Sequence, residues 1–194
     1  MDERVLILDL FDAGLLQFGR FLTRDGVRPF QHHMNMLASY PNLLRRVAHG
    51  LAGQGAEVDR LLCNQDCIPL SVAMSLETGV PLVVGRGGVG DGARDFVGAY
   101  DIGHPAALVV HGQGDVNALL VQHAGRFGLD VRWVLAVLDD EPKVIEVPTH
   151  ALLDLGNVVD VLIEEGRIPG PLGAAVLDWL QEEATRRRPD SAGP

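Results

Sequence analysis

The sequence predicts an α/β fold in which helices cover both faces of a doubly wound, mostly parallel β-sheet. The first observation is that short apolar runs alternate with helical segments over Val58–Leu138, which is typical of βαβ units. The second is the length of 194 residues, which suffices for one sizeable core without a disulfide or a metal. The third is an apolar content of 47%, which is ordinary for a globular domain.

The N-terminal elements are predicted from spacing and from turn residues. Apolar residues at near-helical intervals over Val5–Leu16 predict an amphipathic helix. Phe18–Leu22 predicts a short strand, and Arg24–Gly26 predicts the turn that follows it. Pro41–Gly53 predicts a helix, because proline suits the first helical position and glycine suits the exit.

The central elements follow a regular order. Val58–Cys63 predicts a strand, Ile68–Thr78 predicts a helix that Gly79 ends, and Val80–Val84 predicts the next strand. The glycine-rich segment Gly85–Gly103 comes next, and its composition predicts a mobile loop that cannot pack a core.

The remaining elements complete the predicted sheet. Ala106–Val110 and Val131–Leu138 predict strands, and Asp115–Phe127 predicts the helix between them. The residues of this helix that we expect to face inward are Val116, Leu119, Leu120, His123 and Phe127.

The C-terminal part predicts an edge strand and two helices. The strand is expected at Val144–Val147, and the helices at Leu152–Glu165 and Pro171–Arg186. Residues 186–194 predict a disordered tail, and the arginines at its start fit a solvated helix end.

Charge and cysteine content exclude several classes of protein. Acidic residues number 26 against 16 basic ones, a net charge of −10, so neither nucleic acid nor an anionic membrane is an expected partner. Lys143 is the only lysine, which leaves almost nothing for a mechanism that needs one. Cys63 and Cys67, an acidic N-terminus and the lack of an apolar run of about 18 residues predict a cytoplasmic protein.

Ligands of open parallel sheets bind outside the carboxyl ends of the strands. The loops predicted to leave those ends are Asn64–Cys67, Gly85–Gly103, His111–Gly114 and Asp139–Glu141. In the third loop two glycines let the backbone turn closely before a helix near Asp115, so its N–H groups predict an anion site. The alternative is a tight turn that binds no ligand.

Other polar residues have two interpretations each. His32 and His33 could bind a metal, but adjacent residues of an extended segment point apart, so a hood or dimer surface is favoured. His111 could contact a ribose or, when protonated, a phosphate, or it could be a plain turn residue. The two cysteines are expected to be structural, with a redox or thiolate role as the alternative. Asp139–Glu141 could bind Mg²⁺ or form a solvated turn.

Several segments match a known family in order and spacing. They are Phe18–Phe21 with Arg24–Gly26, Pro41–Ala48, Ile68–Leu70, Gly79–Pro81, Val97–Tyr100, Leu108–Val110 and Leu135–Asp139. From about Leu15 to Glu141 the chain resembles the orotate phosphoribosyltransferases of the type I phosphoribosyltransferase superfamily. The resemblance implies a single domain over residues 1–185, with a small hood formed from about 15–35 and 143–170.

The resemblance also implies where substrates would bind. In the family, two adjacent acids and a loop with glycine and threonine hold the ribose and the 5-phosphate of phosphoribosyl pyrophosphate (PRPP). The residues at those positions here are His111, Gly112, Gln113, Gly114, Asp115, Val116 and Asn117. The residues at the positions of the family's pyrophosphate loop are Asn64, Gln65, Asp66 and Cys67.

The basic residues of the family are mostly replaced. Of the cations in the family's mobile loop only Arg86 remains, with Gly87 and Asp91 near the other positions. Arg24 aligns with a lysine that contacts orotate, and Asp140 aligns with an arginine that does so. Since the departing pyrophosphate needs preorganised positive charge, the resemblance supports the fold and argues against the activity.

We therefore expect a catalytically inactive protein that binds a nucleotide, a sugar phosphate or a protein partner in a regulatory role. One alternative is an active enzyme that converts orotate and PRPP to orotidine monophosphate and pyrophosphate, with Arg86 as a catalytic residue and Mg²⁺ bound with PRPP. Another is a structural, dimerising module. A homodimer is expected, and no resident metal or cofactor is.

Overall fold

The computed structural model describes residues 2–23, 26–54, 57–86, 96–100, 102–142 and 145–186. Its main sheet has six strands in the order β5-β4-β3-β6-β7-β8. These strands are β3 (Arg60–Cys63), β4 (Leu82–Gly85), β5 (Phe96–Val97), β6 (His104–Gly112), β7 (Leu129–Asp139) and β8 (Thr149–Asp154). Every neighbouring pair is parallel except β4 and β5. The prediction of a mostly parallel α/β sheet is confirmed.

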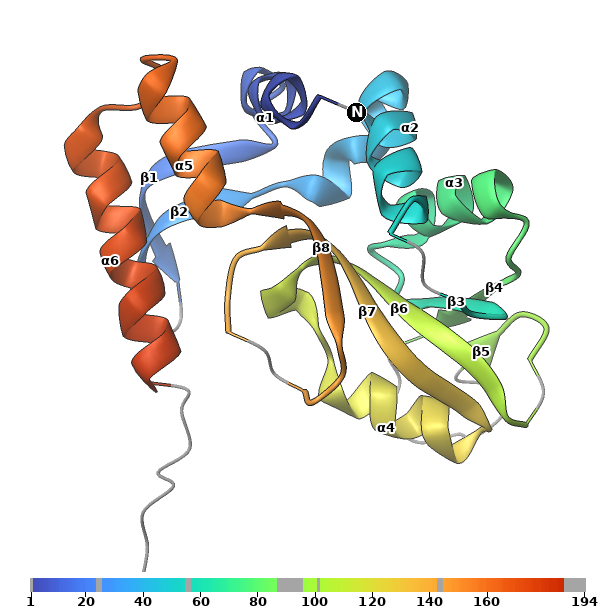
Figure 1. Cartoon of the computed structure of the whole chain (residues 1–194). Coiled ribbons are helices and arrows are strands. Elements are labelled where there is room, and N and C mark those ends of the chain that lie inside the picture. The colour runs from blue at the N-terminus through green and yellow to red at the C-terminus, as the bar shows by residue number, and fades with distance from the viewer. Residues whose placement is uncertain are drawn as a thin grey trace, which may run out of the picture.

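Helices cover both faces of this sheet (Figure 1). The helices are α1 (Glu3–Asp12), α2 (Pro41–Ala52), α3 (Ile68–Thr78), α4 (Ala118–Arg126), α5 (Leu155–Glu164) and α6 (Gly170–Arg186). Residues of α1, α2, α3 and α5 pack with one face of the sheet, and α4 packs with the other. In β3, Leu61 and Cys63 belong to the first of these cores and Leu62 to the second, because successive strand residues point to opposite faces.

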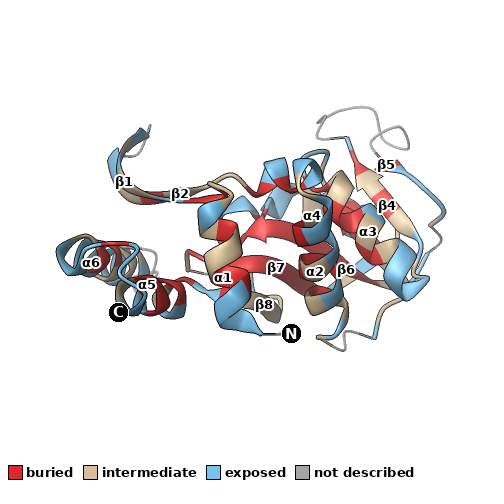
Figure 2. Ribbon diagram, turned by 90° about the horizontal axis from the view of Figure 1, so that it is seen from above, coloured by how far each residue is buried: buried red, intermediate tan, exposed pale blue. Residues whose placement is uncertain are grey.

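A separate antiparallel hairpin lies at one end of the molecule beside α5 and α6 (Figure 2). It consists of β1 (Leu16–Thr23) and β2 (Gly26–His32), and a short 3₁₀ helix, η1 (Met34–Ser39), connects it to α2. Phe30 of β2 is fully buried, and its ring centroid lies 5.4 Å from that of Trp179 in α6. This aromatic contact joins the hairpin to the C-terminal helix.

Two helix boundaries show how capping decides the start of a helix. α3 has its predicted bounds, and Gly79 ends it with a positive φ of 74°. α4 begins at Ala118 rather than at Asp115, because the side chain of Asn117 accepts the N–H groups of Leu119 and Leu120 at 3.0 and 3.1 Å. Residues 113–115 form a separate 3₁₀ turn, η3 (Gln113–Asp115). With this later start Leu119 is 56% exposed, so its predicted inward orientation is wrong.

The edge strand lies later in the chain than predicted. Residues 145–147 are bends, and β8 at Thr149–Asp154 pairs with β7 instead. The side chain of Asp154 accepts the N–H of Asn157 at 2.9 Å, so α5 starts only after it. The run Ala151–Leu153, equally compatible with helix or strand by periodicity, therefore belongs to the strand. Lys143 and Val144 lie outside the described residues, as does the tail from residue 187.

Part of the glycine-rich segment is ordered into the sheet. Phe96 is only 5% exposed, and its ring centroid lies 6.1 Å from that of Tyr100 and 5.6 Å from that of Phe127. The prediction that this segment cannot contribute to a core is wrong at Phe96, where one large aromatic side chain suffices to fill the space beside α4. Gly87 and Asp91 are outside the described residues.

None of the described helices combines the length and the apolar character that crossing a bilayer requires.

Candidate functional site

A polar cavity of about 510 Å³ lies where β2 and η1 meet the loops that follow β3 and β6. Its lining residues are His32, His33, Asn35, Asn64, Asp66, Cys67, His111 and Asp115. We call it the histidine cavity. Because β3 and β6 are parallel neighbours, the residues after their carboxyl ends meet at one edge of the sheet, as the sequence predicts.

Two backbone donors of the loop after β6 are bonded to carboxylates of this chain. The N–H of Gly112 donates to Oδ2 of Asp115 at 3.0 Å, and the N–H of Gly114 donates to Oδ1 of Asp140 at 3.2 Å. At the start of α4, Asn117 accepts the two N–H groups named above. The N–H groups of Gly112, Gly114, Leu119 and Leu120 therefore have carboxylate or amide partners from within the chain.

A side chain at Gly112 would crowd the side chains of Asp140 and His32. A Cβ at this position would lie 2.7 and 2.8 Å from the two carboxylate oxygens of Asp140 and 2.8 Å from Nε2 of His32. Its φ of −122° is open to any residue. The absence of a side chain at residue 112 thus allows the loop, the hairpin and the turn after β7 to approach one another closely.

Asp140 lies behind the cavity and is 1% exposed. Its Oδ2 lies 3.6 Å from Nε2 of His32, which also lies 3.7 Å from Oδ2 of Asp115. Burial raises the pKa of Asp140, and His32 and the N–H of Gly114 oppose that rise. His32 therefore sits between two carboxylates, one from each of two loops.

Arg28 of β2 connects the hairpin to the turn after β7. Its Nη2 lies 2.8 Å from Oε1 of Glu141 and 3.8 Å from Oδ2 of Asp140. The guanidinium carbon lies 5.1 Å from the ring centroid of Phe30 and 4.9 Å from that of Trp179, a cation–π arrangement. A cation from β2 thus lies beside Asp140, the position at which the resemblance implies an arginine.

His111 ends up buried against the cavity, with 5% of its surface exposed. Burial lowers its pKa to about 4, and Asp115 only partly offsets this effect. The imidazole is therefore neutral at pH 7. It cannot attract a phosphate by charge, as the protonated His111 of the sequence-based alternative would.

The loop after β3 is closed in a similar way. The N–H of Cys67 donates to Oδ1 of Asn64 at 3.1 Å, and Asp66 lines the cavity with its carboxylate. Cys63 and Cys67 are both buried free thiols. Burial raises the pKa of Cys63 to about 11 and raises that of Cys67 further, so both thiols are protonated and unreactive at neutral pH.

Several predicted site residues do not reach the cavity. Val116 is 7% exposed and belongs to the apolar core under α4. Gln113 is 1% exposed, and its Oε1 lies 3.5 Å from the hydroxyl of Thr149. Gln65 and Arg86 are exposed and are not part of the lining. Arg24 lies outside the described residues.

Other residues of the site were not predicted from the sequence. Asn35 lines the cavity, and so do His32 and His33, which were predicted on a hood or dimer surface. The ion pair between Arg28 and Glu141 was not predicted either. The available signal was that the histidines stand at the end of a second hairpin strand, but that strand was not predicted.

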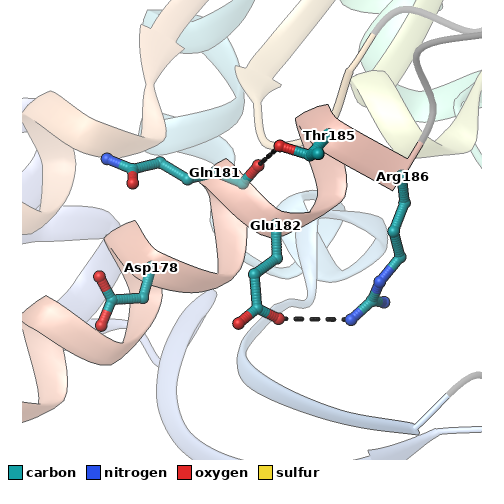
Figure 3. A pocket seen from close by; sticks show the side chains of 5 residues that line it. All are labelled: Asp178, Gln181, Glu182, Thr185 and Arg186. Carbon is teal, nitrogen blue, oxygen red and sulfur yellow. Dashed lines mark hydrogen bonds and ion pairs between the residues drawn. The ribbon is translucent and has the colours of Figure 1, made fainter.

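A further hollow, of about 550 Å³, runs along α6 (Figure 3). Its lining residues, Asp178, Gln181, Glu182, Thr185 and Arg186, all belong to that helix. Arg186 pairs with Glu182 at 3.3 Å, and the hydroxyl of Thr185 donates to the carbonyl of Gln181 at 2.9 Å. Because one helix supplies every side chain and these pair among themselves, this hollow is an ordinary helix surface.

Within the described residues, no group of three or more histidine, cysteine or acidic side chains is arranged to hold a metal ion. The acidic turn has other contacts instead, since Asp140 accepts the N–H of Gly114 and Glu141 pairs with Arg28.

Comparison with known proteins relates the chain to solved structures only. No protein-family model and no curated protein matches it. The UMP synthase of Leishmania donovani matches with a TM-score of 0.83 at 20% identity, over 94% of this chain and 43% of that one. This chain therefore spans less than half the length of that protein.

Two orotate phosphoribosyltransferases match over nearly their whole length. The one from Francisella tularensis has a TM-score of 0.71 at 16% identity, covering 92% of this chain and 98% of that one. The one from Mycobacterium tuberculosis, solved in complex with PRPP, has a TM-score of 0.63 at 15% identity, covering 80% and 98%. At such identities the likeness shows the fold: this chain has the type I phosphoribosyltransferase fold of the orotate enzymes, as the resemblance implied.

Proposed function

We propose that this chain is a degenerate orotate phosphoribosyltransferase-like protein that does not transfer phosphoribosyl groups and instead binds a small ligand in the histidine cavity, in a regulatory role. The observation that carries the proposal is the closed loop after β6. Its backbone donors at Gly112 and Gly114 are bonded to the carboxylates of Asp115 and Asp140.

A phosphate bound at such a turn would need those same N–H groups. It would have to displace a carboxylate and then remain close to it. Two like charges about 4 Å apart repel by about 1 kcal/mol even in bulk water, and by more where solvent is partly excluded, as it is beside the buried Asp140. The loop geometry therefore disfavours the 5-phosphate of PRPP.

The chemical step of the family meets a second obstacle. Departure of pyrophosphate builds negative charge, and removal of one stabilising donor commonly lowers the rate about 100-fold or more. Among the described lining residues Asp66 and Asp115 bring negative charge, and none is a lysine or an arginine. Arg86, the residue expected to act in an active enzyme, is exposed and away from this lining.

The fold itself does not prevent PRPP binding, since the Mycobacterium tuberculosis orotate phosphoribosyltransferase of similar fold was solved with PRPP. The proposed loss of activity therefore lies in the loop residues.

The direct test is to incubate the purified full chain with orotate, PRPP and Mg²⁺ and to measure orotidine monophosphate. The Francisella tularensis orotate phosphoribosyltransferase, assayed at the same concentration, is the positive control. We expect no product above the background without protein. Product at a rate within about 100-fold of the control, the loss expected for one missing donor, would instead establish the active enzyme.

The role of the carboxylates is tested with Asp115→Thr, which removes the charge and leaves an oxygen to accept the N–H of Gly112. We expect inorganic phosphate to bind this variant at least about fivefold more tightly than the wild type, from the relief of one like-charge contact. Isothermal titration calorimetry measures the affinity. Asp178→Asn, an equal change of charge on the exposed face of α6, should leave it unchanged. Equal affinity of Asp115→Thr and wild type would show that the carboxylate does not exclude phosphate.

A further inference from the structure

The histidine cavity has the size of a small-molecule site. Its volume of about 510 Å³ lies within the range of about 300–1,000 Å³ that is usual for ligand pockets. Three segments form its walls: the end of the hairpin with His32 and His33, the loop after β3, and the loop after β6. A molecule of nucleoside size would contact all three walls at once.

Among the described residues, the cavity lining carries two carboxylates and no permanent cation. Asp66 and Asp115 both contribute carboxylates to its lining, and in the part of the chain that the structure describes no lysine or arginine lines it. Arg28, a cation of the hairpin, pairs with Glu141 at 2.8 Å and is not part of the lining. A bound phosphate would face these two carboxylates with no lysine or arginine in the described lining, whereas a bound cation would be attracted by them.

The hydrogen-bonding groups of the cavity favour a ligand that brings donors. Carboxylates only accept hydrogen bonds. Oδ2 of Asp115 accepts the N–H of Gly112, and Oδ1 can accept a hydrogen bond from a ligand. The amide oxygen of Asn64 is bonded to the N–H of Cys67, which leaves the amide nitrogen to donate into the cavity.

An unpartnered ring gives independent support for a ligand. His111 lines the cavity and is 95% buried, and no described residue hydrogen-bonds its imidazole. The buried side-chain atoms without a hydrogen-bond partner in the described residues are Nε of Arg28, Oγ of Ser71 and Nε2 of Gln113, so the ring nitrogens of His111 are not closed off from the cavity. The neutral ring offers one donor and one acceptor to a bound hydroxyl or amine.

From these observations, and resting on the proposed function above, we infer that the histidine cavity binds an unphosphorylated, hydroxyl-rich ligand of nucleoside size that carries a protonated amine. The carboxylates of Asp66 and Asp115 would receive the ammonium group, and His111 and Asn64 would bond to hydroxyl groups. The ligand class differs from the nucleotide or sugar phosphate that the sequence suggests, because the carboxylates of the lining have the opposite sign of charge to the one a phosphate needs.

The test is a charge series on one framework: 5′-amino-5′-deoxyadenosine, adenosine and adenosine 5′-monophosphate, which differ at the 5′ position alone. Affinities for the full chain are measured by isothermal titration calorimetry at pH 7 and low salt. We expect the amine to bind at least about fivefold more tightly than adenosine, which corresponds to one ion pair at about 4 Å in water, and the monophosphate to bind at least about fivefold more weakly.

A variant locates the effect in the cavity. Asp66 is exposed at the rim, so Asp66→Asn removes one charge with little effect on the fold. The preference for the amine over adenosine should fall by about fivefold in this variant. Asp178→Asn, the matched change on α6 outside the cavity, should keep the full preference.

Two results would overturn the inference. One is a monophosphate that binds as tightly as the amine, and the other is the lack of binding by all three compounds at millimolar concentration. Neither result bears on the proposed loss of transferase activity, which the assay with orotate and PRPP decides separately. Formation of orotidine monophosphate in that assay would refute the proposed function even if the amine binds.

Discussion

At the scale of single residues, the site depends on Gly112, whose lack of a side chain lets segments far apart in the sequence approach one another. Gly112 is contacted by Asp140 from the turn after β7 and by His32 from the hairpin, with no room for a methyl group between them. His111, its neighbour, is buried in a neutral form beside the acidic lining of the cavity. A substitution at each of these two residues should change the stability of the protein in a way that can be measured.

Gly112→Ala should destabilise the protein by about 1–3 kcal/mol, because its Cβ would lie 2.7–2.8 Å from the Asp140 carboxylate and His32. Urea denaturation measures the free energy of unfolding. Gly125→Ala is the control, since a Cβ there meets nothing within 4 Å inside α4, and it should stabilise by about 0.5–1 kcal/mol. A Gly112→Ala variant as stable as the wild type would mean that the three segments are not held as tightly as described.

His111 should make the stability depend on pH. Its pKa is lowered from 6.5 to about 4, so between these values the unfolded chain binds more protons than the folded one. The free energy of unfolding therefore rises with pH over that window and is lost as the pH falls, by about 3 kcal/mol in total. His111→Gln should lack this component, which urea denaturation at pH 4.0, 5.5 and 7.0 would reveal.

The exposed residue Gln65, which has no titratable group, provides the comparison for this pH series. Gln65→Ala should leave the pH dependence as in the wild type. If His111→Gln and the wild type lose equal stability on acidification, the neutral, buried state of His111 is wrong.

At the scale of elements, one side chain links three parts of the fold. Arg28 of β2 lies against the ring of Trp179 in α6 and pairs with Glu141 after β7. Because β2 also carries His32, the same strand forms a wall of the histidine cavity. The position of the hairpin over the sheet is therefore set by a cation with both aromatic and acidic neighbours.

Arg28→Met should destabilise the protein by about 2–4 kcal/mol, since it removes the cation from two largely buried carboxylates while keeping a long apolar side chain against the rings. The double variant Arg28→Met/Glu141→Gln should recover part of that loss, as measured by urea denaturation. Arg4→Met, which breaks exposed pairs with Glu164 and Glu165, should change stability by less than about 1 kcal/mol. Equal effects of the two single variants would argue against a structural role for Arg28.

At the scale of the whole molecule, the parallel sheet could be predicted from the sequence and the arrangement of the hairpin could not. The strands β3, β6 and β7 are covered on both faces, so their sequences are continuous apolar runs between helical segments. Gly79 marks the end of α3 because only a residue free of Cβ strain readily takes its positive φ.

The site was predictable to the extent that it depends on strand order. The loops Asn64–Cys67 and His111–Gly114 were predicted at one edge, because neighbouring parallel strands end there. The carboxylate of Asp140 beside the N–H of Gly114 depends on side-chain positions between loops 26 residues apart, which periodicity does not encode. Arg28 and His32 depend on how the hairpin folds over the sheet, and β2 itself was not predicted.

The predicted homodimer remains to be tested on the intact protein. Light scattering coupled to size-exclusion chromatography should give about twice the chain mass of 20.9 kDa. The segment Arg24–Pro41 is expected near the interface, so dilution into the monomer range should alter amide exchange in the described part of that segment, residues 26–41. A mass of 20.9 kDa at micromolar concentration would show that the chain is monomeric.

The closed loop after β6 has a consequence for how this protein responds to its surroundings. A ligand that binds only the folded state stabilises it by RT ln(1 + [L]/Kd), which couples the fold to the supply of that ligand. Because Asp115 and Asp140 take the place of an external anion, this part of the chain is ordered without one. Under the proposed function, the folding of this loop does not depend on the concentration of phosphorylated metabolites, whether they are scarce or abundant.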